Sequence, residues 1–315
     1  MKNRNINVLL MVLSILVLSY STSNAQTEPM YSQYMYNMLG VNPAYAGNRE
    51  ATSLNFFQRN QWIGLKGAPK TTSVSIDQAV HESNMGWGVQ AYDDRLGVEA
   101  ATGVNAMLST KIRVSENGVL SGGLSIGLMN YKVNLNDVMN RYTPNDPSFV
   151  STSKPSQWMP MVGAGLFYNT DKFYMGLSSP SLLQSRMAIY ANLNSGIQKM
   201  DAFHLFLNAG YVLTLNEDVK LKPSTMIKMV SGAPIEFDLN TNIWLRDVVS
   251  LGASYRTGDA VVGMVETQIN ENLKMGYAYD MTISPLKYYN NGSHEILLRY
   301  EFSNNKAKVK STRYF

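Results

Sequence analysis

Apolar and polar side chains alternate along the stretch from Ser293 to Phe302. One side of an extended chain carries only apolar and aromatic residues, and the other carries two acids and a base: Ile296, Leu298, Tyr300 and Phe302 against Glu295, Leu297, Arg299 and Glu301. Such a strand, ending on an aromatic residue, is typical of the last strand of an outer-membrane barrel. It also fits an amphipathic strand of a soluble sandwich, so one strand does not decide between the two.

The same period-two pattern recurs along the chain and predicts about fourteen strands. Residues such as Leu273, Met275 and Tyr277 oppose Lys274, Gly276 and Ala278, which a helical period would not sort in this way. The predicted strands are 51–59, 69–79, 85–93, 98–113, 119–133, 160–169, 172–178, 202–214, 219–230, 235–245, 248–257, 260–269, 272–281 and 293–302.

The lengths of the connections between these strands alternate as well. Every even-numbered connection is short, and the three long ones, 134–159, 179–201 and 282–292, are all odd-numbered. Outer-membrane barrels have short periplasmic turns and longer external loops. We therefore predict an all-β fold: a transmembrane outer-membrane antiparallel β-barrel over residues 51–302. A soluble sandwich or propeller gives no reason for this sorting.

The first 25 residues have the organisation of a secretory signal peptide. Lys2 and Arg4 precede an apolar run from Val8 to Leu18, and small residues follow up to Ala25. The run is shorter than the roughly 20 apolar residues of a membrane-spanning helix. We predict cleavage after Ala25, export across the inner membrane and a location in the outer membrane of a Gram-negative cell.

Charge and cysteine content narrow the classes of partner. The chain has no cysteine, which excludes disulfides, thiolate metal sites and a lipidated cysteine anchor. The formal net charge of +4 is concentrated in residues 303–315, where four bases and no acid predict a basic periplasmic tail. Without this tail and the signal peptide, acids slightly outnumber bases. The body therefore offers no case for binding nucleic acid.

No motif for catalysis or for a cofactor is present. The three histidines, His81, His204 and His294, lie on separate strands or turns without metal-ligand spacing, and no nucleophile elbow or phosphate-binding loop occurs. His204 is expected to face the lumen as a hydrogen-bonded structural residue. We predict a protein that is not an enzyme and has no cofactor or metal.

Residues 26–50 precede the first strand and do not alternate. They contain Tyr31-Ser32-Gln33-Tyr34-Met35-Tyr36-Asn37 and then Asn42-Pro43-Ala44-Tyr45-Ala46-Gly47, in which Asn-Pro and Ala-Gly indicate turns. Two interpretations remain open: a periplasmic lead-in peptide packed under the barrel, or a plug or docking segment.

These N-terminal residues, with two further motifs, resemble the PorP/SprF family. The other motifs are Arg59-x-Gln61-Trp62-x-Gly64-x-x-Gly67-Ala68-Pro69-x-Thr71 and Ser293-His294-Glu295. The resemblance spans nearly the whole mature chain. It implies an outer-membrane protein of Bacteroidota that serves type IX secretion or gliding motility. It also implies two kinds of partner: the C-terminal domain of secreted adhesin-type cargo, and secretion components of the periplasm and outer membrane.

Five aromatic residues are candidates for partner binding. Trp62 is assigned to the external loop between the first two strands, and the long loops 134–159 and 179–201 supply Tyr142, Phe149, Trp158 and Tyr190. Their alternative role is the aromatic belt at the bilayer surface. Arg59, near the end of the first strand, is predicted to be a lumen charge paired with Glu266 or Asp280.

Two other functions remain alternatives to cargo handling. Polar lumen faces would suit a general diffusion porin. The basic tail would suit a structural tether to the periplasmic secretion ring, although such a tail is more commonly a solvated end.

Overall fold

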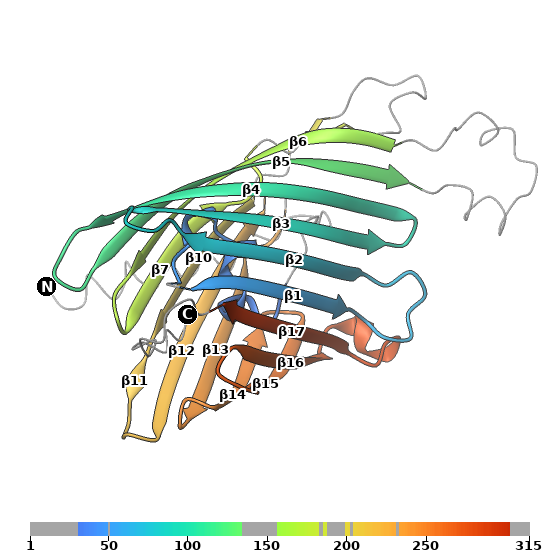
Figure 1. Ribbon diagram of the computed structural model, residues 1–315. Helices are drawn as coiled ribbons and strands as arrows, with labels where there is room; N and C mark the ends of the chain where they lie inside the picture. Colours follow the sequence, from blue (N-terminus) through green and yellow to red (C-terminus); the bar gives the residue numbers. More distant parts are fainter. Residues whose placement is uncertain are drawn as a thin grey trace, which may run out of the picture.

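A computed structural model describes residues 31–49, 51–133, 156–182, 185–187, 199–201, 204–230 and 233–302 (Figure 1). Within these residues the chain forms a closed antiparallel β-barrel of fourteen strands, one of which is interrupted. No helix in the described ranges is long and apolar enough to cross a membrane.

The barrel strands follow one another around the wall in the order of the sequence. Their bounds are β1 Thr52–Asn60, β2 Lys70–Ala79, β3 Met85–Leu96, β4 Glu99–Arg113, β5 Val119–Val133, β6 Ser156–Asn169, β7 Phe173–Ser179, β10 His204–Tyr211 continued by β11 Leu213–Thr214, β12 Val219–Val230, β13 Glu236–Leu245, β14 Val249–Arg256, β15 Ala260–Gln268, β16 Leu273–Thr282 and β17 Ser293–Phe302. A separate two-stranded pair joins β8 Ser185–Met187 to β9 Lys199–Asp201.

The barrel closes by pairing its first strand with its last. β1 is antiparallel to β17, with Thr52 opposite Phe302, so both ends of the barrel chain lie at the same end of the wall. Opposite this seam, β10 pairs with β7 on one side and with β12 on the other. These pairings join strands β1–β7 to strands β12–β17. This even strand number agrees with the sequence prediction.

The period-two pattern sorts side chains between the outer face and the lumen. In β17, Ile296, Leu298 and Tyr300 are exposed on the outer surface, whereas Glu295 and Arg299 are buried inside. The other described strands expose mainly leucine, valine and isoleucine outside, and they bury glycine, serine, asparagine and charged residues inside, together with methionine and aromatic residues such as Phe57 and Phe167. An apolar outer face and a polar interior are what a barrel in a bilayer requires.

The connections define the two ends of the barrel. The even-numbered turns, 80–84, 114–118, 170–172, 215–218, 246–248 and 269–272, lie together at the end where the barrel chain begins and finishes. The longer connections lie at the opposite end. By the rule that periplasmic turns are short, this second end is external.

Three strands differ from the prediction by more than two residues at one end or in continuity. β3 continues to Leu96 rather than ending at residue 93. β6 begins at Ser156 rather than at residue 160, because residues 156–159 continue the ladder with β5. The predicted strand 202–214 is divided at Val212, whose N–H donates to the carbonyl of Lys172 at 2.7 Å and leaves the β12 ladder. Residues 202 and 203 lie outside the described residues.

Candidate functional site

The lumen contains the segment that precedes the first strand. Residues 31–49 form three short 3-10 helices, η1 Tyr34–Tyr36, η2 Met38–Gly40 and η3 Pro43–Tyr45. Almost every residue of the segment is buried, including Tyr34, Met35 and Met38 at 1% exposure or less. Asn42 begins η3: its Oδ1 accepts the N–H of Ala44 at 2.9 Å, and Pro43 occupies the first helical position. We call residues 31–49 the lumen segment.

A cluster of charged groups holds the start of the lumen segment to the wall in the external half. Arg59 binds Asp280 at 2.7 Å and Glu295 at 2.6 Å. Glu295 in turn accepts the backbone N–H groups of Ser32 at 2.9 Å and Gln33 at 2.6 Å. A buried carboxylate needs both a charge partner and hydrogen-bond donors, and the lumen segment supplies two of the donors.

The second arginine of this cluster is Arg256. It binds Asp238 at 3.0 Å and donates to the Ser32 hydroxyl at 3.1 Å. Lys228 completes the group by binding Asp238 at 2.9 Å. Ser32 therefore contacts Arg256 from β14 and Arg59 from β1, and it joins distant parts of the wall.

The end of the lumen segment is held near the periplasmic end. Arg49 binds Glu301 at 2.8 Å, and the N–H of Gly47 donates to Asp77 at 3.0 Å. Between the charged cluster around Arg59 and these contacts near the periplasmic end, Arg299 donates to the carbonyl of Tyr36. The segment thus runs from the external half of the lumen to the periplasmic entrance of β1.

Tyrosine hydroxyls join the middle of the segment to the opposite wall. The Tyr36 hydroxyl bonds to Asn242 at 3.0 Å, and Tyr34 accepts from the amide of Asn240 at 2.8 Å. Burial raises the pKa of both tyrosines well above the ordinary value, so both side chains stay neutral.

Glycines in the wall make room for the lumen segment. A Cβ on Gly123 of β5 would lie 2.3 Å from the backbone nitrogen of Ala44, and one on Gly165 of β6 would lie 2.0 Å from the Oδ1 of Asn42. Any larger residue at these two positions would push the segment away from the wall. Gly123 and Gly165 therefore form part of the wall surface against which the lumen segment packs.

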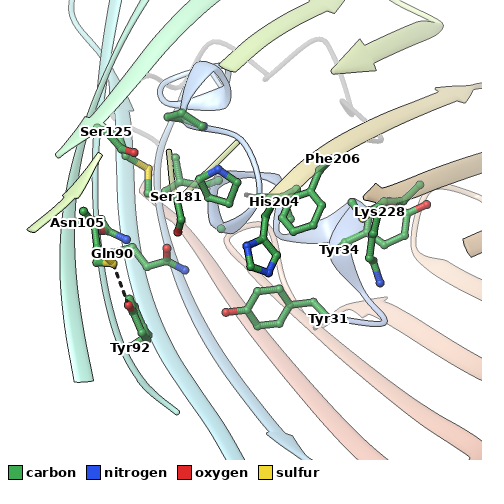
Figure 2. Close-up of a pocket in the computed structure, with 18 of the residues that line it drawn as sticks. Tyr31, Tyr34, Gln90, Tyr92, Asn105, Ser125, Ser181, His204, Phe206 and Lys228 are labelled. Atoms are coloured by element: carbon green, nitrogen blue, oxygen red, sulfur yellow. Dashed lines mark hydrogen bonds between the residues drawn. The ribbon is translucent and has the colours of Figure 1, made fainter. Parts of the chain in front are cut away.

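A small cavity lies between the lumen segment and the barrel wall. Figure 2 shows Gln90, Tyr92 and Asn105 on one side of it and His204 and Phe206 on the other. Its volume is about 60 Å³, which accommodates a few water molecules. His204 is buried and faces the lumen, as predicted.

The external end of β1, β2, β16 and β17 carries a second candidate surface, which we call the loop platform: residues 61–69 and 283–292. Ile63 and the opposing loop are joined by two backbone hydrogen bonds of 2.8 Å, to Gly292 and from Asn291. The N–H of Trp62 donates to the Ser293 hydroxyl at 3.1 Å. Trp62 has a left-handed backbone with φ of 43°, so a defined turn sets its position.

The loop platform is apolar and basic. Tyr288 and Tyr289 are 78% and 70% exposed, and Ile63, Leu65 and Leu286 are exposed as well. Lys66 and Lys287 are exposed beside them, and neither loop contains an acid. Exposed aromatic and aliphatic side chains with a uniform charge are the features of an interaction surface.

The structure separates the five predicted partner-binding residues. Trp62 lies in the loop platform and is half-buried. Trp158 was assigned to a loop, but it lies on β6 and is 67% exposed on the outer face, because that strand begins earlier than predicted. Tyr142, Phe149 and Tyr190 lie outside the described residues. Sequence reasoning did not single out Tyr288 and Tyr289, although their position in the loop 282–292 was available.

The predicted lumen pairing of Arg59 is correct for Asp280 and wrong for Glu266. Glu266 lies near the periplasmic end of β15, whereas Arg59 lies near the external end of β1. The sequence analysis missed Glu295 as the second partner, although its inward position had been recognised. Its place opposite Arg59 in the β1–β17 register could have identified it. In the described part of the chain, no group of three or more His, Cys, Asp or Glu is placed to hold a metal ion.

The closed antiparallel wall, its apolar outer face and its polar filled interior define an outer-membrane β-barrel protein. Residues 23–300 match the family described as type IX secretion system membrane protein PorP/SprF, and the chain belongs to that family. No curated protein matches the chain. Its family makes it an outer-membrane component of type IX secretion.

Three of the solved structures to which the chain is similar are the following. The CymD monoaromatic hydrocarbon channel has 11% identity and a TM-score of 0.48, over 89% of this chain and 95% of that one. Omp33 of Acinetobacter baumannii has 8% identity and a TM-score of 0.46, over 80% and 99%. The KdgM porin has 10% identity and a TM-score of 0.38, over 80% and 99%.

Proposed function

We propose that this barrel is a closed, non-enzymatic component of type IX secretion that assists export or surface retention of adhesin-type cargo by binding the cargo's C-terminal domain. The observation that carries the proposal is the filled lumen. Because the lumen segment is bonded to the wall at the external half, the middle and the periplasmic end, the interior suits a sealed support better than a conduit.

We infer that the cargo domain binds at the external end of the barrel. The loop platform offers exposed Tyr288 and Tyr289 with Lys66 and Lys287 around them. Aromatic residues dominate the binding energy of protein interfaces, and a lysine rim favours an acidic partner surface. We infer that Trp62 supports this surface, because its backbone is bonded to the base of the opposite loop.

The test is a deletion of the gene followed by measurement of the adhesin-type proteins on the cell surface, inside the cell and in the medium. We expect the adhesin to be lost from the cell surface, either retained inside or released into the medium. Complementation with the wild-type gene should restore it. An adhesin that is still secreted and attached to cells without this barrel would overturn the proposal.

The two alternative functions, a diffusion porin and a periplasmic tether, would depend on other features of the chain. A diffusion porin needs an open lumen, and the lumen segment counts against it. A tether to the periplasmic ring would act through residues 303–315, which lie outside the described residues. If the tail is the tether, removing residues 306–315 lowers co-purification of the periplasmic components while the barrel stays folded.

A further inference from the structure

An apolar groove lies on the lipid-facing side of the wall, along strands β3 to β7. Its volume is about 950 Å³. Among the described residues that line it, Leu108, Leu124 and Leu166 are more than half exposed on the outer face. Gly122 stands opposite Leu166, and Ala164 stands opposite Leu124. The groove therefore has ridges of leucine beside hollows at Gly122 and Ala164.

Gly122 leaves space on the outer face of β5. A Cβ at this position would meet only Leu166, at 3.9 Å. The space lies in the apolar outer band of the barrel, which faces the hydrocarbon of the outer membrane. An acyl chain in a groove contacts protein on more than one side, and each added contact contributes dispersion energy that a convex surface does not offer. The groove therefore suits an acyl chain better than the rest of the outer face does.

The groove is closer to the periplasmic end of the wall than to the external end. On β5 its lining runs from Gly122 to Ile126. Gly122 is three residues from the periplasmic start of the strand, Val119, whereas Ile126 is seven residues from the external end, Val133. Met85, the first residue of β3 after a periplasmic turn, also lines the groove. An acyl chain of the periplasmic leaflet therefore reaches the groove directly.

Charged side chains of both signs lie at the periplasmic end of the same strands. β5 pairs with β4 and with β6, so the turns that follow β4 and β6 are neighbours. The first turn carries Arg113 and Glu116, and the second carries Asp171 and Lys172. All four side chains are exposed, and none forms an ion pair within the described residues. Tyr168 lies on the outer face of β6 between the groove and these turns, where an aromatic side chain is favoured at the bilayer surface. The turns thus offer two bases for a phosphate and two acids for an ammonium group.

We propose that this groove binds one phospholipid of the periplasmic leaflet, with an acyl chain over Gly122 and a zwitterionic ethanolamine head group at the two turns. Arg113 and Lys172 contact its phosphate, and Glu116 and Asp171 contact its ammonium group. A head group with negative charge alone would be repelled by the two acids. A glycolipid of the outer leaflet would enter from the external end, which lies farther from the groove. The site is separate from the loop platform and does not depend on cargo binding.

Native mass spectrometry of the full-length barrel, purified from its own outer membrane in mild detergent, tests the groove. Gly122→Leu places a side chain where the acyl chain would lie. The matched control is Gly263→Leu on the outer face of β15, where an added Cβ has no neighbour within 4 Å. We expect about one phosphatidylethanolamine on the wild-type barrel and on the control, and at least about tenfold less on Gly122→Leu. Heat-modifiable mobility in gels shows that both variants are folded.

A second pair of variants tests the head group. The delipidated barrel is titrated with mixed micelles that contain either phosphatidylethanolamine or phosphatidylglycerol. We expect the wild-type barrel to bind phosphatidylethanolamine at least about threefold more tightly than phosphatidylglycerol. The double variant Glu116→Gln with Asp171→Asn should prefer phosphatidylglycerol, because only the two bases remain. The control double variant, Glu217→Gln with Glu271→Gln, removes exposed acids from turns outside the groove and should keep the wild-type preference.

Three results would overturn the proposal. Equal retention of phospholipid by Gly122→Leu and Gly263→Leu would show that lipid covers the groove only as it covers the rest of the outer face. Loss of an outer-leaflet glycolipid, or of a second copy of this chain, from Gly122→Leu would assign the groove to that occupant instead. An unchanged head-group preference after substitution of Glu116 and Asp171 would refute the role of the turns. None of these results tests cargo binding, which the gene deletion addresses separately.

Discussion

Arg59 shows what a buried charge does in this barrel. Its side chain is 1% exposed and contacts Asp280, Glu295 and the Ser32 hydroxyl, so it joins the barrel wall to the lumen segment. Arg59 is the cationic partner of Glu295, and it shares Asp280 with Arg256, which lies 3.6 Å from that carboxylate. Removing one member of a buried ionic group is far more damaging than removing an exposed ion pair, because charge is left without a partner in a medium of low polarity.

We therefore expect Arg59→Ala to lower the free energy of unfolding by about 3–5 kcal/mol. Urea titration of the barrel folded into lipid vesicles measures this. The control is Arg95→Ala, which removes the partner of Asp93 at the exposed end of β3 and should cost at most about 1 kcal/mol. Equal effects of the two substitutions would contradict the structural role of Arg59.

Neighbouring glycines on β5 provide a second test at the residue scale. Gly123 faces the lumen segment, whereas a Cβ on Gly122 would meet only Leu166, at 3.9 Å on the outer face. We expect Gly123→Val to cost about 1–3 kcal/mol and to make residues 31–49 accessible to added protease. Gly122→Val should stay within about 0.5 kcal/mol of wild type and leave the segment protected. Protection of the segment in both variants would show that its packing does not depend on Gly123.

At the scale of elements, the loop platform depends on two loops that are far apart in the sequence. The loop 61–69 and the loop 283–292 meet because β1 pairs with β17, which brings their external ends together. The short 3-10 helix η5, Pro285–Tyr288, then presents Tyr288 outward, and Tyr289 follows it directly. Neither loop alone would hold this arrangement.

We expect the double substitution Tyr288→Ala and Tyr289→Ala to weaken binding of the cargo's C-terminal domain by at least about tenfold, because exposed aromatic anchors carry much of the energy of an interface. Surface plasmon resonance with the purified domain measures the affinity. The control is Tyr255→Ala on β14, an aromatic residue that is 45% exposed on the outer face and lies outside the loop platform. If the tyrosine pair can be removed without effect, the loop platform is not the docking surface.

At the scale of the whole molecule, the barrel is a wall built around its own N-terminal chain. Among the described residues, the lumen segment contributes ten of the 23 residues of the main buried apolar cluster, including Tyr34, Met35 and Leu39. The wall contributes the other thirteen and most of the buried polar and charged groups. A barrel of fourteen strands without such a filling would enclose water.

Deletion of residues 31–49 should therefore convert a closed barrel into a conducting one. We expect the wild-type protein to show no steady current in a planar lipid bilayer and the deletion variant to show a stable conductance. Retained heat-modifiable gel mobility would show that the variant is folded. A large, steady current from the wild-type protein would favour the porin alternative instead.

The sequence by itself determined the elements that depend on local period. Alternation along strands such as β17 and β16 identified the wall, its outward face and the even strand number, because each strand must bury one face and expose the other. The family resemblance came from three motifs: the N-terminal residues 31–47, the motif around Trp62 and Ser293-His294-Glu295. Boundaries were less certain where pairing rather than pattern extends a strand, as at the start of β6.

The tertiary structure alone decided what the lumen contains and which groups meet there. Residues 31–49 have no repeating pattern, so nothing local distinguishes a lead-in from a filling. Arg59, Glu295 and Ser32 lie far apart in the chain and come together only because closure of the barrel sets the register of β1 against β17.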